Sequence, residues 1–465
     1  MKMSNCFLGI LQIEKYLLFN HRRFYKLGLF VIIMDINLEK LNKNRVLIKD
    51  AFNKKGNVEL AGWVHNKRAL GKIRFLLLRD ISGIIQITGV ESKIKKEIFE
   101  VMDNVSNESV IYVKGEIKDC KQAPGGKEII PENIEIIAKA ENPIIDVSDF
   151  SKTELPKRLD YRFLDFHRRK VQAIFKIQNE ISNSFREFFY KKNFIEMQPP
   201  CIISSSSEGG TELFEVKYFE KKAYLAQSPQ LYKQMLACSM EKIFMITPVW
   251  RAEKHNTTRH INEIRQMDIE CAFMGQMEVM KELEEVVKYI ISQVLKKCKI
   301  ELDELGVKLK IPKAVYLSYE EAIKKVKGKI GEDFTPEQEK KLCDMYPGDI
   351  VFTHSWPSSI KPFYIMPKDG KKDAKLSEGF DALYGGMEIS SGGQRIHIPD
   401  LLIERLKVKK LNPKNFEFYV DSFRYGSPMH SGWSVGLERL TQVICNLDNI
   451  KEATMFPRDR DRLTP

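Results

Sequence analysis

Between residues 58 and 137 the chain alternates short β-rich runs with turn residues, and this pattern strongly constrains the fold of its N-terminal part. β-Branched, aromatic and apolar residues predict strands at residues 58–65, 75–79, 84–88, 110–117 and 134–137. Gly71 and the Ser82 and Gly83 pair mark turns between the first three. An amphipathic stretch at 93–102 predicts a helix before the fourth. This order is that of a five-stranded OB β-barrel, a fold that binds oligonucleotides in many proteins but not in all.

The composition describes a globular protein with a mild excess of positive charge. The 465 residues are 43% hydrophobic and 30% charged, which argues against disorder and allows two or three domains. The net charge of +12 permits a nucleic-acid partner without requiring one. No apolar run approaches the ~18 residues that cross a bilayer, so we expect no membrane partner. The eight cysteines are scattered without C-x-x-C spacing, which indicates reduced thiols in a cytoplasmic protein.

Four segments are predicted along the chain. In residues 1–33 apolar clusters alternate with basic residues, and a polar stretch begins after Met34, where we expect translation to start. The alternative is a genuine extension that docks on a partner. Residues 34–140 are assigned to the barrel, and Pro143 with the acidic stretch 146–149 indicates a hinge over 141–170. Residues 171–465 form a second domain.

The second domain mixes helices with strands. A long helix is predicted at 171–192, because Ile174, Ile177, Ile181 and Phe185 recur at spacings of three and four. Further helices are predicted at 279–297 and 438–446, and strands at 242–248, 266–273 and 416–421.

Neither a Walker-type loop nor a dinucleotide-binding glycine motif is present, so a bound nucleotide needs other groups. The chain instead pairs arginine with carboxylate in three places. In the first, Arg251 follows a predicted strand, Glu253 and Arg259 lie in a polar loop, and the next strand carries Asp268. The planar guanidinium suits bidentate phosphate binding, although such a pattern alone is also typical of surface ion pairs.

The other two places are rich in glycine. Glu388 and Ser391 lie between glycine pairs and offer oxygen ligands to Mg²⁺. Arg439 opens a predicted helix just after Gly436, where backbone N–H groups favour phosphate. A glycine-rich turn is the alternative explanation for the Glu388 segment, and the Arg439 segment is weak evidence by itself.

Taken together and in this order, the three elements resemble the second signature, the metal-binding strand and the third signature of class II aminoacyl-tRNA synthetases. Pro200 stands where the first, dimer-forming signature has its proline. Several runs look like aspartyl-tRNA synthetases of the archaeal type: SEGGTELF at 207–214, QSPQLYK at 227–233, HNTTRH at 255–260, PFYIM at 362–366 and FPRDRDRLTP at 456–465. The likeness implies an α+β homodimer, with the OB barrel followed by a class II catalytic domain whose antiparallel sheet is flanked by helices.

The resemblance also implies a reaction that needs no protein nucleophile: ATP activates an amino acid, which is then transferred to tRNA. Arg251 and Arg439 would be catalytic, and Glu388 and Ser391 would hold Mg²⁺. The residues implied to bind ATP are Arg251, Glu253, Arg259, His260, Ile261, Glu388, Gly436, Leu437, Glu438 and Arg439. Those implied to bind the amino acid are Glu208, Gln230, Lys233, Arg251, Asp268, Ser391 and Arg395.

Lys233 and Arg395 match the family's cations for the side-chain carboxylate of L-aspartate. Asparaginyl-tRNA synthetases, the nearest relatives, usually have a small residue in place of Lys233. Because a buried ammonium facing a neutral amide would cost roughly 3–5 kcal/mol, Lys233 favours aspartate. Ser434 and Ile264 depart from the family's glycine and from an aromatic under the adenine, and neither departure removes a charge.

In the barrel, Phe75 matches the aromatic that stacks on an anticodon base, a contact worth ~1–3 kcal/mol. The implied base-contacting residues around it are Arg68, Gln86 and Glu128. His65 and Pro124 stand where relatives restricted to tRNA(Asp) tend to carry Trp and Lys. We therefore expect both tRNA(Asp) and tRNA(Asn) as partners, with a downstream tRNA amidotransferase acting on Asp-tRNA(Asn).

Three alternatives remain beside this interpretation: an asparaginyl-tRNA synthetase, a tRNA-independent asparagine synthetase on the same core, and a non-catalytic RNA-binding paralogue. Lys233 speaks against the first and the intact barrel against the second. The arginines and Glu388 of the three elements argue against the third.

Overall fold

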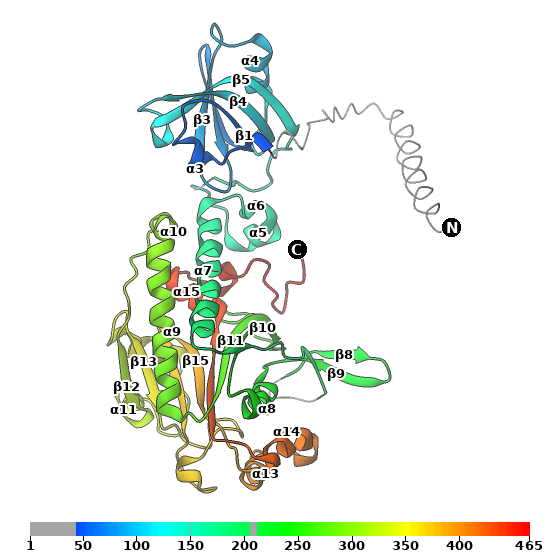
Figure 1. The fold of residues 1–465 in the computed structure, drawn as a ribbon, viewed down its shortest axis with the longest axis vertical. Coiled ribbons are helices and arrows are strands. Elements are labelled where there is room, and N and C mark those ends of the chain that lie inside the picture. Colours follow the sequence, from blue (N-terminus) through cyan, green and yellow to red (C-terminus); the bar gives the residue numbers. More distant parts are fainter. Residues whose placement is uncertain (1–42, 149, 205–211) are drawn as a thin grey trace. The chain divides into compact units, whose positions relative to one another are not determined.

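The computed structural model describes residues 43–148, 150–204 and 212–465, and the chain separates into two compact units between Ile144 and Ile145 (Figure 1). The expectations for residues 1–33 and for Glu208 lie outside the described residues. Among the described residues, no helix combines the length and apolar character needed to span a bilayer.

The first unit is a closed barrel with the strand order β1-β2-β3-β5-β4, which confirms the predicted OB fold. Its core is made of aliphatic side chains such as Leu60, Leu76 and Val113. Its elements are α3 (Ile48–Ala51), β1 (Gly56–Leu70), β2 (Ile73–Arg79), β3 (Ile84–Val90), α4 (Lys96–Asn104), β4 (Val110–Asp119), the 3₁₀ turn η1 (Pro124–Gly126) and β5 (Lys127–Ala138).

The last barrel strand is much longer than the predicted 134–137. The sequence did not predict residues 127–133 as part of this strand. The run Pro131, Glu132 and Asn133 argued against it, because proline and asparagine are depleted in strands. Pro131 is tolerated because it pairs with Gly115 at a register shift between β4 and β5. This extension brings Glu128 into the sheet opposite Gln86.

The second unit is built on an eight-stranded sheet with the order β12-β13-β14-β15-β16-β11-β10-β6. Most neighbouring strands are antiparallel, as predicted, while β12 and β13, and β10 and β6, pair in parallel. The strands are β6 (Ile195–Glu196), β10 (Lys242–Trp250), β11 (Glu263–Ala272), β12 (Ala314–Ser318), β13 (Ile350–His354), β14 (Gly379–Tyr384), β15 (Met387–Gln394) and β16 (His430–Gly436). A smaller sheet contains β7 (Ile202–Ile203), β9 (Lys221–Leu225) and β8 (Glu215–Tyr218).

Two long helices, α7 (Arg169–Lys191) and α9 (Gln276–Lys297), run side by side and pack on one face of the large sheet (Figure 1). On β11, Met267, Ile269 and Cys271 join this apolar core, and the intervening Asp268 and Glu270 point to the opposite face. The remaining helices and 3₁₀ turns are α5 (Leu155–Asp160), α6 (Arg162–Asp165), α8 (Gln230–Met240), α10 (Lys299–Leu305), α11 (Tyr319–Lys325), α12 (Pro336–Asp344), η2 (Lys368–Gly370), α13 (Pro399–Val408), η3 (Pro413–Phe416), α14 (Glu417–Ser422), η4 (Phe423–Tyr425), α15 (Leu437–Ile444) and η5 (Ile450–Ala453).

The strand predicted at 416–421 is wrong, because this stretch is the turn η3 followed by helix α14. Its aromatic and β-branched residues suggested a strand, yet the buried side chains are Phe416, Tyr419, Val420 and Phe423. That spacing of three, four and seven is a helical face.

The segment predicted as a hinge includes two short helices that are tied to the C-terminal part of the second unit. The Arg162 guanidinium donates to the backbone carbonyls of Glu452, Thr454 and Met455, and it pairs with Asp165 at 2.5 Å. Residues 155–165 thus pack with the second unit, and the boundaries at 140 and 170 stay predictions.

Candidate active site

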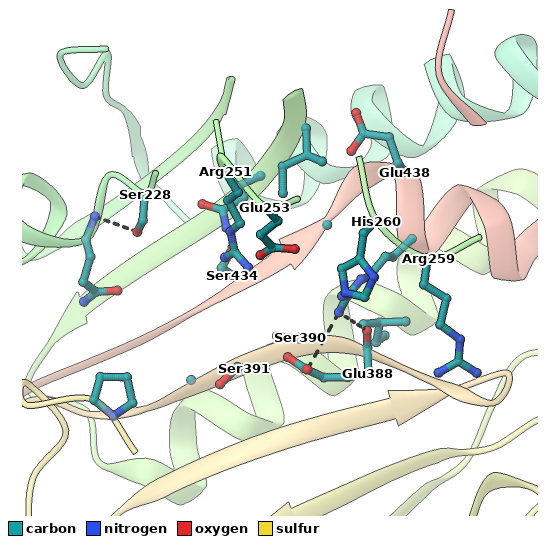
Figure 2. Close-up of a pocket in the computed structure, with 18 of the residues that line it drawn as sticks. Ser228, Arg251, Glu253, Arg259, His260, Glu388, Ser390, Ser391, Ser434 and Glu438 are labelled. Atoms are coloured by element: carbon teal, nitrogen blue, oxygen red, sulfur yellow. Dashed lines mark hydrogen bonds and ion pairs between the residues drawn. The ribbon is translucent and has the colours of Figure 1, made fainter. Parts of the chain in front are cut away.

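A cavity of about 280 Å³ lies on the face of the large sheet opposite α7 and α9. Figure 2 shows residues that line it. Side chains from β15 and β16, from the loop after β10 and from the start of α15 line it. The residues predicted for substrates that line this cavity are Gln230, Arg251, Glu253, Arg259, His260, Ile261, Glu388, Ser391, Arg395, Gly436, Glu438 and Arg439. Three elements far apart in the sequence therefore converge on one site.

Arg251 directly follows β10, and the loop after it is folded back onto itself. The Arg251 backbone N–H donates to the carbonyl of Asn262 at 2.9 Å. The Asn262 amide returns hydrogen bonds to the carbonyls of Arg251 and Glu253 at 2.7 and 2.9 Å. This closed loop places Glu253 and His260 at the cavity (Figure 2).

Residues 451–461, near the C-terminus, form hydrogen bonds with the loop that follows β10. The Asn256 amide donates to Asp461 at 2.7 Å and accepts from Lys451 at 2.7 Å. The Asn262 backbone N–H donates to the carbonyl of Arg458 at 2.8 Å. The C-terminal run that resembles the family therefore braces the loop that carries Glu253 and Arg259.

Two arginines that the resemblance assigns to the phosphates of ATP, Arg259 and Arg439, line the cavity, and the part of the cavity beside them is called the phosphate end. Arg439 Nη1 donates to the backbone carbonyl of Glu388 at 2.9 Å and lies 3.7 Å from its carboxylate. Burial, and then the charge of Arg439, lower the pKa of His260, which favours the neutral form of its ring. Glu438 is buried, and both its oxygens accept from the Arg265 backbone N–H at 3.1 and 3.0 Å. In the structure, Glu438 thus connects helix α15 to strand β11.

The oxygen donors near the phosphate end fit a Mg²⁺ ion. Glu388 lines the cavity, and Glu339 of α12 lies close enough that burial and the Glu388 charge raise the pKa of Glu339 to about 7. Such crowding of negative charge is what a divalent cation relieves. No group of three or more His, Cys, Asp and Glu side chains converges within the described residues. Mg²⁺ usually takes one or two protein carboxylates plus phosphate oxygens and waters, and the Glu388 carboxylate at the cavity is a ligand of this kind.

Lys233 and Arg395 lie together under the other end of the cavity, joined by Glu270. Lys233 is 1% exposed, and its Nζ lies 3.6 Å from Asp268 and 3.5 Å from Glu270. Arg395 donates to Glu270 at 3.0 Å. Burial raises the pKa of Asp268, and Lys233 opposes that shift. Two cations and two carboxylates make a buried cluster that is close to neutral before any substrate binds.

Several residues of the site were missed by sequence reasoning. Glu270 lies two residues after Asp268 on β11, and Gly432 leaves room for its carboxylate because a Cβ there would collide with it. Lys361 lines the cavity and pairs with Asp381 at 2.6 Å. The position of Lys361 directly before PFYIM was a signal for it. Nothing in the sequence pointed to Glu339 as a site residue, because α12 contains none of the motifs that resemble the family.

The barrel brings the predicted anticodon-binding residues onto adjoining strands. Arg68 on β1 is opposite Phe75 on β2, which is in turn opposite Thr88 on β3. Glu128 accepts from Gln86 at 3.0 Å and from Thr88 at 2.5 Å.

His65 lies at a register shift of β1, where its Nδ1 is 3.0 Å from Arg79 Nη1. Arg79 is itself paired with Glu108 at 2.7 Å. Pro124 begins η1, four residues before Glu128. The ring of His65 is therefore held by a buried ion pair.

Residues 154–460 match the model of "tRNA synthetases class II (D, K and N)", and residues 58–137 match an OB-fold nucleic acid binding domain. The chain belongs to the class II tRNA synthetases of the D, K and N group. Within it, the chain is 45% identical to the "Aspartate--tRNA(Asp/Asn) ligase" of Archaeoglobus fulgidus, over 88% of this chain and 96% of that protein. It is also 45% identical to the "Aspartate--tRNA(Asp) ligase" of Pyrococcus horikoshii, with the same coverage.

A solved structure shares the fold over nearly its full length. The asparaginyl-tRNA synthetase of Pyrococcus horikoshii with asparaginyl-adenylate superposes with a TM-score of 0.84 at 33% identity, covering 90% of this chain and 99% of that one. The chain is thus similar both to proteins named as aspartate ligases and to an asparaginyl-tRNA synthetase.

Proposed function

We propose that the protein is an aspartate–tRNA ligase that activates L-aspartate with ATP and transfers it to tRNA(Asp) and tRNA(Asn). The observation that carries this proposal is the buried pair of cations, Lys233 and Arg395, beside a cavity lined by phosphate-binding arginines. Relatives at 43–45% identity bear the name "Aspartate--tRNA(Asp/Asn) ligase", which supports both the amino acid and the relaxed tRNA choice.

The proposed chemistry proceeds by positioning and charge stabilisation. A carboxylate oxygen of aspartate attacks the α-phosphorus, and pyrophosphate leaves. Arg251 holds the reacting carboxylate and α-phosphate, while Arg259 and Arg439 bind the outer phosphates. Mg²⁺, held by Glu388 and Ser391, would neutralise phosphate charge. A hydroxyl of the terminal adenosine of tRNA then attacks the carbonyl carbon, and AMP leaves.

Pyrophosphate exchange tests this proposal directly. We expect ATP–pyrophosphate exchange with aspartate and little with asparagine, because Lys233 and Arg395 favour a carboxylate over a neutral amide. Charging assays with both tRNAs then identify the acceptors. Exchange driven by asparagine in preference to aspartate would make the protein an asparaginyl-tRNA synthetase.

A second prediction concerns the third anticodon base, C in tRNA(Asp) and U in tRNA(Asn). His65 is smaller than an indole, and Pro124 has neither charge nor backbone N–H, so neither enforces C over U. We expect charging efficiencies for the two tRNAs within about tenfold, or ~1.4 kcal/mol. The double change His65→Trp, Pro124→Lys should selectively suppress charging of tRNA(Asn). A wild-type protein that rejects tRNA(Asn) about a thousandfold contradicts relaxed specificity alone.

The same proposal includes a homodimer and a tRNA amidotransferase that converts Asp-tRNA(Asn). The short strand β6 lies at one end of the large sheet. Its residue Ile195 is 49% exposed, and Tyr190, which donates to Glu196 of β6, is 53% exposed. An exposed sheet edge with apolar neighbours favours pairing with a second copy. Light scattering of the purified protein measures the mass and decides between monomer and dimer.

A further inference from the structure

Arg259 is fixed at the phosphate end of the cavity by two anchors from distant parts of the chain. Its Nη1 lies 2.9 Å from the carboxylate of Glu339, and its Nη2 donates to the carbonyl of Gly386 at 3.0 Å. Glu339 belongs to α12, eighty residues away and outside all the motifs that resemble the family.

The pair is partly shielded from water, with side-chain exposures of 26% for Arg259 and 16% for Glu339. A charge-assisted bond in such surroundings is stronger than one on an open surface. Together the two anchors restrict the long, flexible arginine side chain before a ligand arrives. A preorganised side chain loses less entropy when it binds phosphate.

Helix α12 holds Glu339 without relying on Arg259. Thr335 and Gln338 cap the first turn reciprocally, at 3.0 and 3.3 Å. Leu342 and Cys343 are buried in a separate apolar cluster. The carboxylate is therefore presented by a fixed element, so removing its charge should leave the helix in place.

We propose that Glu339 is a positioning residue for amino-acid activation, acting through Arg259 to hold that guanidinium at the outer phosphates of ATP. This inference rests on the proposed function, because the proposed function is what makes the cavity an ATP-binding site.

The experiment is a double-mutant cycle of Glu339→Gln and Arg259→Ala in the full chain, read as the Kd of ATP by calorimetry and the KM of ATP in exchange. We expect Glu339→Gln to weaken ATP binding by about tenfold, the order for a lost charge-assisted bond, and to leave the KM of aspartate and the Tm nearly unchanged. In the Arg259→Ala background, Glu339→Gln should add less than about twofold. Glu339→Asp should recover part of the loss, and Glu404→Gln, which changes an exposed side chain on α13, should behave as wild type.

Equal effects of Glu339→Gln with and without Arg259 overturn the inference, as does unchanged ATP affinity in the single variant. A fall in Tm together with a rise in the KM of aspartate would assign Glu339 to folding instead. Absence of aspartate-dependent exchange in the wild type would refute the proposed function, while the calorimetric cycle would still decide the role of Glu339.

Discussion

Replacing Lys233 with alanine is expected to lower kcat/KM for aspartate in pyrophosphate exchange by two orders of magnitude or more. Its ammonium is buried between Asp268 and Glu270, and Glu270 also holds Arg395. Without Lys233, Arg395 faces two carboxylates alone, and the added side-chain carboxylate of aspartate meets net negative charge. Breaking a buried pair costs about 3–5 kcal/mol, which is a factor of hundreds or more.

Part of that cost would appear as lost stability, because two carboxylates stay buried without their cation. Lys233→Met keeps most of the side-chain volume and is the companion variant, with thermal unfolding measured for both. Lys281→Met, an exposed position on α9, is the matched control. Exchange that survives Lys233→Ala within about threefold, in a folded protein, would show that Lys233 does not govern aspartate binding.

Local patterns in the sequence were enough for the elements that follow a regular period. The barrel strands and α7 were predictable because their apolar residues recur at two or at three and four positions. The strand prediction for 416–421 was wrong because six residues rich in Phe, Tyr and Val fit the period of a strand as well as that of a helix. Only the packing against Phe363 and Leu402 selects the helix. Strand β5 was underestimated because a bulge in β5 itself, at Glu132 between Pro131 and Asn133, lets Pro131 pair with Gly115 inside the sheet.

Residues of the candidate site were predictable where a sequence motif contains them and unpredictable where only a tertiary contact brings them to the site. Arg251, Glu388 and Arg439 come from three motifs, and the sheet brings them together at one cavity. Glu270 and Glu339 act by contacting a cation from another element, Arg395 in one case and Arg259 in the other. No spacing along the chain encodes such a contact, since the partners are 125 and 80 residues apart.

Glu388→Gln is expected to abolish aspartate-dependent exchange and to leave tRNA binding nearly intact. The substitution removes one carboxylate charge at the phosphate end and therefore weakens the hold on Mg²⁺, which prefers charged oxygen ligands. Arg439 should stay in place, because its bond at 2.9 Å goes to the backbone carbonyl of residue 388, which the substitution leaves unchanged. Loss of the metal, and not of the arginine, would then be the cause.

Two measurements separate this explanation from general damage. Raising the Mg²⁺ concentration should restore part of the exchange in Glu388→Gln, since weakened binding is compensated by mass action. The affinity for tRNA should depend instead on the barrel, which is a separate compact unit, so Phe75→Ala should weaken tRNA binding while preserving exchange. Stacking of one base is worth ~1–3 kcal/mol, which predicts that Phe75→Ala weakens tRNA binding by a factor between about 5 and about 150. If Glu388→Gln weakened tRNA binding to the same degree as Phe75→Ala, the substitution would have disturbed the fold, and the metal role of Glu388 would lose its support.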